Sequence, residues 1–148
     1  MLNSNKKDNI IYLVIYLHKL IDKDFDNKAS SLGITGQQGR ILLFINRKTL
    51  CEQTIVHQND IENEFHLSKS TVSGLVKRLE IKGLISIEKQ HPYAVIQLSD
   101  KGKDIICHLI EHRKENIDQL TKGLDEKDKQ VACEYLVKLI NNMEGGNG

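Results

Sequence analysis

The chain has 148 residues, of which 39% are hydrophobic and 28% charged, and this length and composition fit one soluble globular domain, or a small domain with helical extensions. The formal net charge of +1 excludes a polycation, so any surface for nucleic acid must be local. Three widely spaced cysteines, with no signal peptide and no apolar run long enough for a membrane span, predict a cytoplasmic protein with no membrane partner.

The N-terminal part predicts two helices. The first is amphipathic and covers about residues 7–25, and residues 22–28 are expected to be charged and solvated. After Gly33, Thr35 and Gln38 have the spacing of a capping box for a second helix. That helix is apolar nearly all round at residues 41–45 and should stop near residues 46–48, before a loop over residues 49–54.

The middle of the chain predicts two short helices followed by a hairpin. A very short strand at Ile55 and Val56 precedes a helix over residues 58–65, and a second helix runs from Ser68, a good N-cap, to Lys82. Two strands follow, residues 84–88 and 94–98, joined by a turn that contains the only proline. This order is that of a winged helix-turn-helix, which binds double-stranded DNA.

The C-terminal part is helical again. Ser99 caps a long predicted helix that continues to about Lys122, and Asp125 opens a last helix with apolar residues on one side. The tail, residues 144–148, is expected to be disordered. There are no internal repeats and there is no inter-domain linker.

The helix over residues 68–82 has the two faces that a DNA-reading helix needs. Its buried stripe would be Val72, Leu75, Val76 and Leu79. Between residues 66 and 89, five basic residues against two acidic ones give a local excess of +3. The alternative that periodicity leaves open is a solvated lysine and serine face. The residues opposite the stripe or at its edges are Lys69, Ser70, Thr71, Ser73, Gly74, Lys77 and Arg78.

Five segments in register resemble the MarR-type transcriptional regulators. The segments are residues 33–38, residues 58–61, residues 67–73 followed by 79–80 and 83–85, residues 98–102 and residues 124–128. The resemblance covers about residues 8–143 and implies a mainly α fold with a small β-hairpin wing. The winged lobe would be residues 30–100, and residues 7–25 and 100–143 would be dimerisation helices. The implied DNA-binding residues are those of the exposed helix face together with Gln58, Asn59, Ser68, Lys89 and His91.

The resemblance also implies a function and its partners. The chain would be a homodimeric repressor that binds a palindromic promoter operator and is released by a small-molecule effector, with no enzymatic activity and no cofactor. Two features depart from the family pattern. The wing tip lacks the usual arginine, so a minor-groove contact would have to come from Lys89 or His91. His57 replaces the usual hydroxyl cap before the motif.

The sequence offers several candidate sensing groups. The effector pocket of the family lies between the dimer helices and the winged module. His108 and His112, four residues apart on one helix, are candidate zinc ligands, but the family's other ligands are missing, so no metal site is predicted. A metal- or redox-responsive regulator and a helical protein that binds other proteins are the alternatives. The candidate pocket residues are Tyr12, Tyr16, His18, Arg40 and Phe44.

Overall fold

The computed structural model describes residues 4–89 and 92–145. It divides into two compact units, Met1–Ile110 and Glu111–Gly148. Their helical elements are η1 (Ser4–Lys6), α1 (Ile10–Ser31), α2 (Gly36–Asn46), η2 (Arg47–Cys51), α3 (Gln58–Phe65), α4 (Lys69–Ile81), α5 (Asp100–Leu120) and α6 (Glu126–Met143). The strands are β1 (Ile85–Lys89) and β2 (Ala94–Leu98), so the predicted mainly α fold with a hairpin is confirmed.

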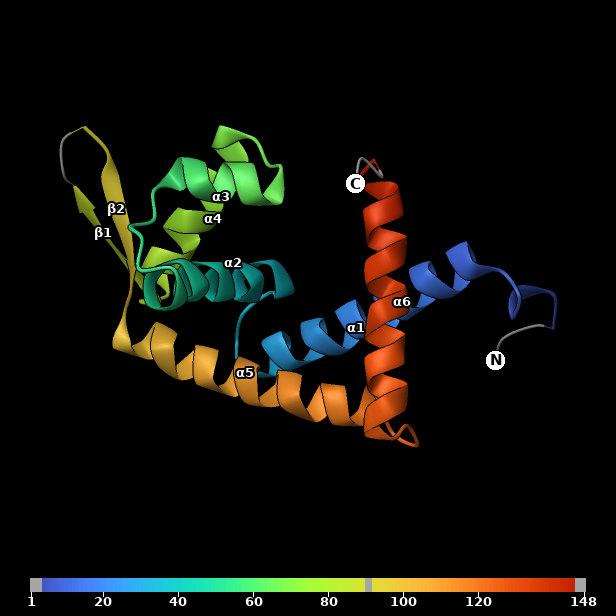
Figure 1. Ribbon diagram of the computed structural model, residues 1–148. Helices are drawn as coiled ribbons and strands as arrows, with labels where there is room; N and C mark the ends of the chain where they lie inside the picture. The colour runs from blue at the N-terminus through green and yellow to red at the C-terminus, as the bar shows by residue number, and fades with distance from the viewer. Residues whose placement is uncertain (1–3, 90–91, 146–148) are drawn as a thin grey trace. The chain divides into compact units, whose positions relative to one another are not determined.

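The first unit is built around one apolar core. The buried cluster takes residues from α1 to α4, from both strands and from the first part of α5. Ile41, Leu42 and Ile45 of α2 are each 0% exposed, in agreement with the apolar character predicted for residues 41–45. The hairpin extends from the packed helices α2, α3 and α4 (Figure 1).

Helix α1 is longer than predicted, because it ends at Ser31 and not near Phe25. The charged stretch after residue 21 is helical, and one side of it packs on α2. Ala29 is fully buried, and Asp22 and Asp26 both pair with Arg40 of α2. Sequence periodicity missed this extension because the partner of the two carboxylates lies in another helix.

Helix α2 begins as predicted and ends differently. The Thr35 hydroxyl accepts from the Gln38 backbone N–H at 3.1 Å, and the Gln38 side chain accepts from the Thr35 N–H at 3.0 Å, so the capping box is confirmed. The predicted loop from residue 49 is wrong for its first residues. The chain continues into the π-helical turn η2, where the Glu52 N–H donates to the Arg47 carbonyl at 3.0 Å.

The two strands form an antiparallel hairpin, called the wing below. The register runs from Ile85 opposite Leu98 to Lys89 opposite Ala94. Val56 adds an isolated antiparallel bridge to Ile96 on the outer side of β2, so the short strand predicted at Ile55 and Val56 is reduced to a single bridging residue. Val56 and Ile96 are 0% and 2% exposed, which fixes the base of the wing in the core.

The second unit contains the C-terminal part of α5 and all of α6. Asp125 and Asp128 form a capping box at the start of α6, with a 2.7 Å bond from the Asp128 N–H to the Asp125 side chain. Tyr135, Leu136 and Ile140 of α6 are each about half exposed or more. Over residues 4–89 and 92–145, no helix combines the length and apolar character that a membrane span requires.

Candidate nucleic-acid interface

Helix α4 has one buried and one exposed face, as its sequence spacing predicts. Val72, Val76 and Leu79 are 0%, 3% and 0% exposed and pack into the core. Gly74 is half-buried at the edge of the opposite face. Every other residue predicted to bind DNA on this helix or at its cap is exposed, namely Ser68, Lys69, Ser70, Thr71, Ser73, Lys77 and Arg78.

Three hydroxyl side chains are linked at the start of α4. The Ser68 hydroxyl accepts from the Thr71 N–H at 3.3 Å, which confirms Ser68 as the N-cap. Ser68 also donates to the Thr71 hydroxyl at 2.9 Å and lies 3.2 Å from the Ser70 hydroxyl. These bonds orient small polar groups around the first turn, where a recognition helix approaches base edges and phosphates.

The first turn of α3 lies beside the start of α4. The Gln58 amide donates to the Lys69 carbonyl at 3.3 Å, and Asn59 is exposed. Next to these two turns lies a cleft of about 340 Å³. It is lined by predicted DNA-binding residues of both helices and by residues of the wing. Its lining residues are His57, Gln58, Asn59, Glu62, Lys69, Pro92, Tyr93 and Ala94.

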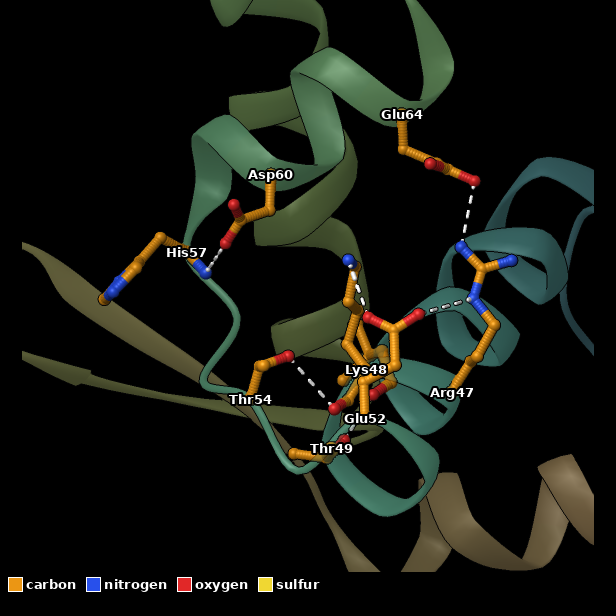
Figure 2. A network of polar contacts seen from close by, with 9 residues as sticks. Arg47, Lys48, Thr49, Glu52, Thr54, His57, Asp60 and Glu64 are labelled. Carbon is orange, nitrogen blue, oxygen red and sulfur yellow. Dashed lines mark hydrogen bonds and ion pairs between the residues drawn. The ribbon is translucent and has the colours of Figure 1, made fainter.

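His57 lines this cleft but is not among the predicted DNA-binding residues. Its backbone N–H donates to the Asp60 carboxylate at 2.8 Å, whereas its ring points away from Asp60 (Figure 2). The ring Nδ1 lies 2.9 Å from the Ala94 carbonyl, and the ring centroid lies 5.8 Å from that of Tyr93. The missing hydroxyl cap was the only sequence signal at this position.

Lys82 has a structural role that its sequence position does not reveal. Its ammonium group donates to the Gly33 carbonyl at 3.1 Å and to the Gln38 side chain at 3.0 Å. Gln38 is only 3% exposed, so this lysine joins the end of α4 to the start of α2. On the wing, Lys89 is exposed at the end of β1, and the predicted contact by His91 lies outside the described residues.

Ion pairs join η2 to α3 (Figure 2). The Arg47 guanidinium lies 3.1 Å from Glu64 of α3 and 3.8 Å from Glu52, and the Lys48 ammonium lies 2.8 Å from the other Glu52 oxygen. The Lys48 hydrogen bond, together with the charges of Lys48 and Arg47, lowers the pKa of Glu52 although desolvation opposes the shift. The network thus links η2 to α3 at the surface.

The predicted effector residues do not form one group. The Arg40 guanidinium lies 3.1 Å from Asp22 and 3.0 Å from Asp26, and it stacks on Phe25. His18 lies 3.1 Å from Asp22. Further along α1, Tyr12 and Tyr16 stack on each other, with ring centroids 5.9 Å apart.

Phe44 belongs to the core, because it is 4% exposed and packs edge-on against Phe65. Of the candidate zinc ligands, His108 is exposed and His112 lies 3.9 Å from Glu115. Within the described residues, no three histidine, cysteine or acidic side chains gather as metal ligands do. Cys51, Cys107 and Cys133 are all exposed.

Solved structures of regulators share this fold. The chain resembles MepR, a regulator of a Staphylococcus aureus multidrug efflux pump, with a TM-score of 0.78 and 24% identity over 91% of this chain and 98% of that chain. A Bacillus stearothermophilus MarR family protein gives a TM-score of 0.76 at 23% identity, covering 97% and 99%. A MepR–DNA complex gives 0.72 at 24% identity, covering 91% and 96%. No curated protein sequence matches the chain.

The family model described as the MarR family matches residues 32–91. The winged helix-turn-helix segment of this chain is therefore similar to that of the MarR family. The matched range runs from the start of α2 into the wing, so it contains α4, η2 and His57.

Proposed function

We propose that this chain is a MarR-type transcriptional regulator, which acts as a homodimeric repressor and places α4 in the major groove of each half-site of a palindromic operator. The observation that carries the proposal is the exposed face of α4, where hydroxyl and basic side chains stand opposite a fully packed apolar face. Lys69 and Ser73 are the proposed base contacts, and Lys77 and Arg78 the proposed phosphate contacts.

The dimer is proposed from the apolar surfaces of the two units. In the first unit, Ile11, Val14 and Ile15 of α1 are 72%, 48% and 49% exposed. In the second unit, Val137 and Ile140 of α6 are 53% and 52% exposed. Exposed apolar faces of this kind have an unfavourable free energy of hydration, and they mark association surfaces. Two copies related by a two-fold axis would read half-sites roughly 34–36 Å apart.

Release of DNA by a small molecule is proposed from the family. The mechanism would be a change in the separation of the two α4 helices when the effector binds one conformation more tightly. Among the candidate pocket residues, Arg40 would be the one best suited to bind an acidic ligand. Such a ligand would have to compete with Asp22 and Asp26 for the guanidinium.

The experiment that tests DNA reading compares specific and non-specific binding. An operator duplex is first selected with the wild-type protein from fragmented genomic DNA, and a scrambled duplex of the same composition is the competitor. Lys69→Ala and Ser73→Ala are expected to weaken operator binding by about 1–3 kcal/mol each while changing binding to the scrambled duplex less. The assay is run at several salt concentrations, since the phosphate component is salt-dependent.

The matched controls are Lys23→Ala and Ser30→Ala, which replace exposed residues of the same types on α1. They should leave both affinities unchanged. Equal losses on both duplexes for Lys69→Ala and Ser73→Ala would remove the base-reading role. Failure of the wild-type protein to bind any duplex at low salt would overturn the proposal as a whole.

A further inference from the structure

The outer edge of β2 is only partly paired. The Ile96 N–H donates to the Val56 carbonyl at 2.8 Å, and this bridge is the only pairing that the described residues give that edge. Because backbone groups alternate in direction along a strand, Ala94 presents its carbonyl to the same edge as Ile96. Just after Val56 the chain turns into α3, so no backbone group continues the pairing to Ala94.

The His57 ring takes the place of that missing pairing. Its Nδ1 lies 2.9 Å from the Ala94 carbonyl oxygen, and since a carbonyl only accepts, Nδ1 must carry the proton. The ring also lies against Tyr93, which is 66% exposed. This contact between the His57 side chain and residues 93–94 is called the His57 tether below.

The tether leaves α3 without a side-chain cap. A serine or threonine hydroxyl at this position would accept from the first free N–H groups of α3. His57 contributes only backbone groups to α3: its N–H donates to the Asp60 carboxylate, and its carbonyl accepts from the Asp60 N–H at 3.1 Å. The side chain at position 57 is thus directed to the wing and not to its own helix.

We propose that His57 is a positioning residue for DNA binding, which holds the wing at a fixed distance from α3 and α4. The inference rests on the proposed function of α4. The cleft beside His57 is bordered by Asn59 and Lys69 on the helices and by Pro92 and Tyr93 on the wing. A DNA duplex bound with its bases facing α4 would run past this cleft. The angle of the wing would then decide whether the wing and the two helices contact the same duplex.

The tether is separate from what keeps the wing folded. The base of the wing is held by Val56 and Ile96, which are both in the core, whereas the His57 ring is only half-buried and its bond is exposed. Removing the tether should therefore change the orientation of the wing and leave the fold in place.

The test uses variants that separate positioning from stability. His57→Thr removes the tether and supplies a helix cap, so we expect an unchanged or raised Tm together with about three- to tenfold weaker operator binding, as for one lost exposed hydrogen bond. His57→Phe keeps a ring beside Tyr93 but has no donor, and it should lose affinity without a rise in Tm. Ser86→Ala, at an exposed position of β1, is the matched control and should leave both unchanged.

Two further measurements show where the change occurs. In the variants, footprinting should lose protection on the wing side of each half-site and keep the major-groove protection due to α4. In the wild-type protein without DNA, nitrogen NMR shifts of the imidazole should report a proton on Nδ1, which a purely solvated ring would not require.

Three results would overturn the inference. Wild-type operator affinity and footprint in His57→Thr would remove the positioning role. A proton on Nε2 alone would remove the tether, whatever the DNA assays give. A wild-type protein that binds no duplex would overturn the proposed function itself, which is visible before any variant is compared.

Discussion

Two helical glycines have opposite surroundings. A Cβ atom on Gly102 of α5 would lie 2.1 Å from the backbone carbonyl oxygen of Leu84, a distance that no side-chain rearrangement relieves. A Cβ on Gly74 of α4 would meet only the end of the Arg78 side chain, at 4.0 Å. Gly102 is therefore required by packing within the protein, whereas Gly74 is not.

Alanine at these two positions should change stability in opposite directions. Gly102→Ala is expected to lower the free energy of unfolding by about 1–3 kcal/mol, because the backbone must shift to relieve the overlap. Gly74→Ala should raise it by about 0.5–1 kcal/mol, because alanine loses less backbone entropy in a helix. Urea unfolding of both variants measures the difference, and each serves as the control for the other.

Gly74→Ala should also weaken operator binding although it stabilises the fold. The added methyl group would occupy the space through which DNA approaches the exposed face of α4. A Gly74→Ala protein with raised stability and unchanged operator affinity would show that this glycine has no part in DNA binding.

At the scale of elements, the π-helical turn η2 depends on charges at its end. Glu52 follows the turn and pairs with Lys48 and Arg47 inside it. The Thr54 hydroxyl and backbone N–H both donate to the Lys48 carbonyl, at 3.1 and 2.9 Å, and thereby close the turn (Figure 2). The turn is thus held mainly by polar contacts at the surface.

This arrangement predicts an acid-sensitive contribution to stability. The pKa of Glu52 is lower in the folded protein than its ordinary value of 4.5, so the ionised form is favoured by folding. The contribution is fully present above pH 4.5 and is lost as the pH falls through the lowered pKa. Glu52→Gln should therefore reduce the fall in Tm between pH 5 and pH 3. The difference in Tm between the variant and wild type should be smallest at pH 3.

The measurement is a series of thermal unfolding curves between pH 3 and pH 7. Glu134→Gln is a suitable control, because Glu134 is an exposed carboxylate on α6 whose partner is the neutral amide of Gln130. Parallel pH profiles of wild type and Glu52→Gln would contradict the role of the ion pairs in η2.

Local signals in the sequence were sufficient for much of the fold. Thr35 and Ser68 mark helix starts because each cap bond spans only three residues. Contacts between distant segments were not predictable in this way. The end of α1 depends on Arg40, and the role of Lys82 depends on Gly33, 49 residues earlier. The His57 ring reaches a carbonyl 37 residues away.

At the scale of the whole molecule, the exposed apolar residues of α1 and α6 lead to a prediction about assembly. Ile15→Glu or Ile140→Glu would place a charge in the proposed interface, where its desolvation is unfavourable. We expect wild type to sediment as a dimer and both variants as monomers, with the core of the first unit still folded. Binding to a two-half-site operator should fall accordingly.

Lys19→Glu is the matched control, since it introduces the same residue at an exposed polar position of α1. It should remain dimeric. Dimeric sedimentation of both apolar-face variants, or monomeric sedimentation of wild type, would contradict the proposed assembly.

The internal bonds of Lys82 have a consequence for the search for an operator. Its ammonium group is held by Gly33 and Gln38, so it is not placed to replace a counterion on the DNA backbone, although it adds to the positive count of the region. When fewer counterions are released, the affinity for DNA of any sequence is lower. We therefore expect short residence on non-operator DNA and frequent transfer between sites, which leaves operator occupancy to the contacts of α4.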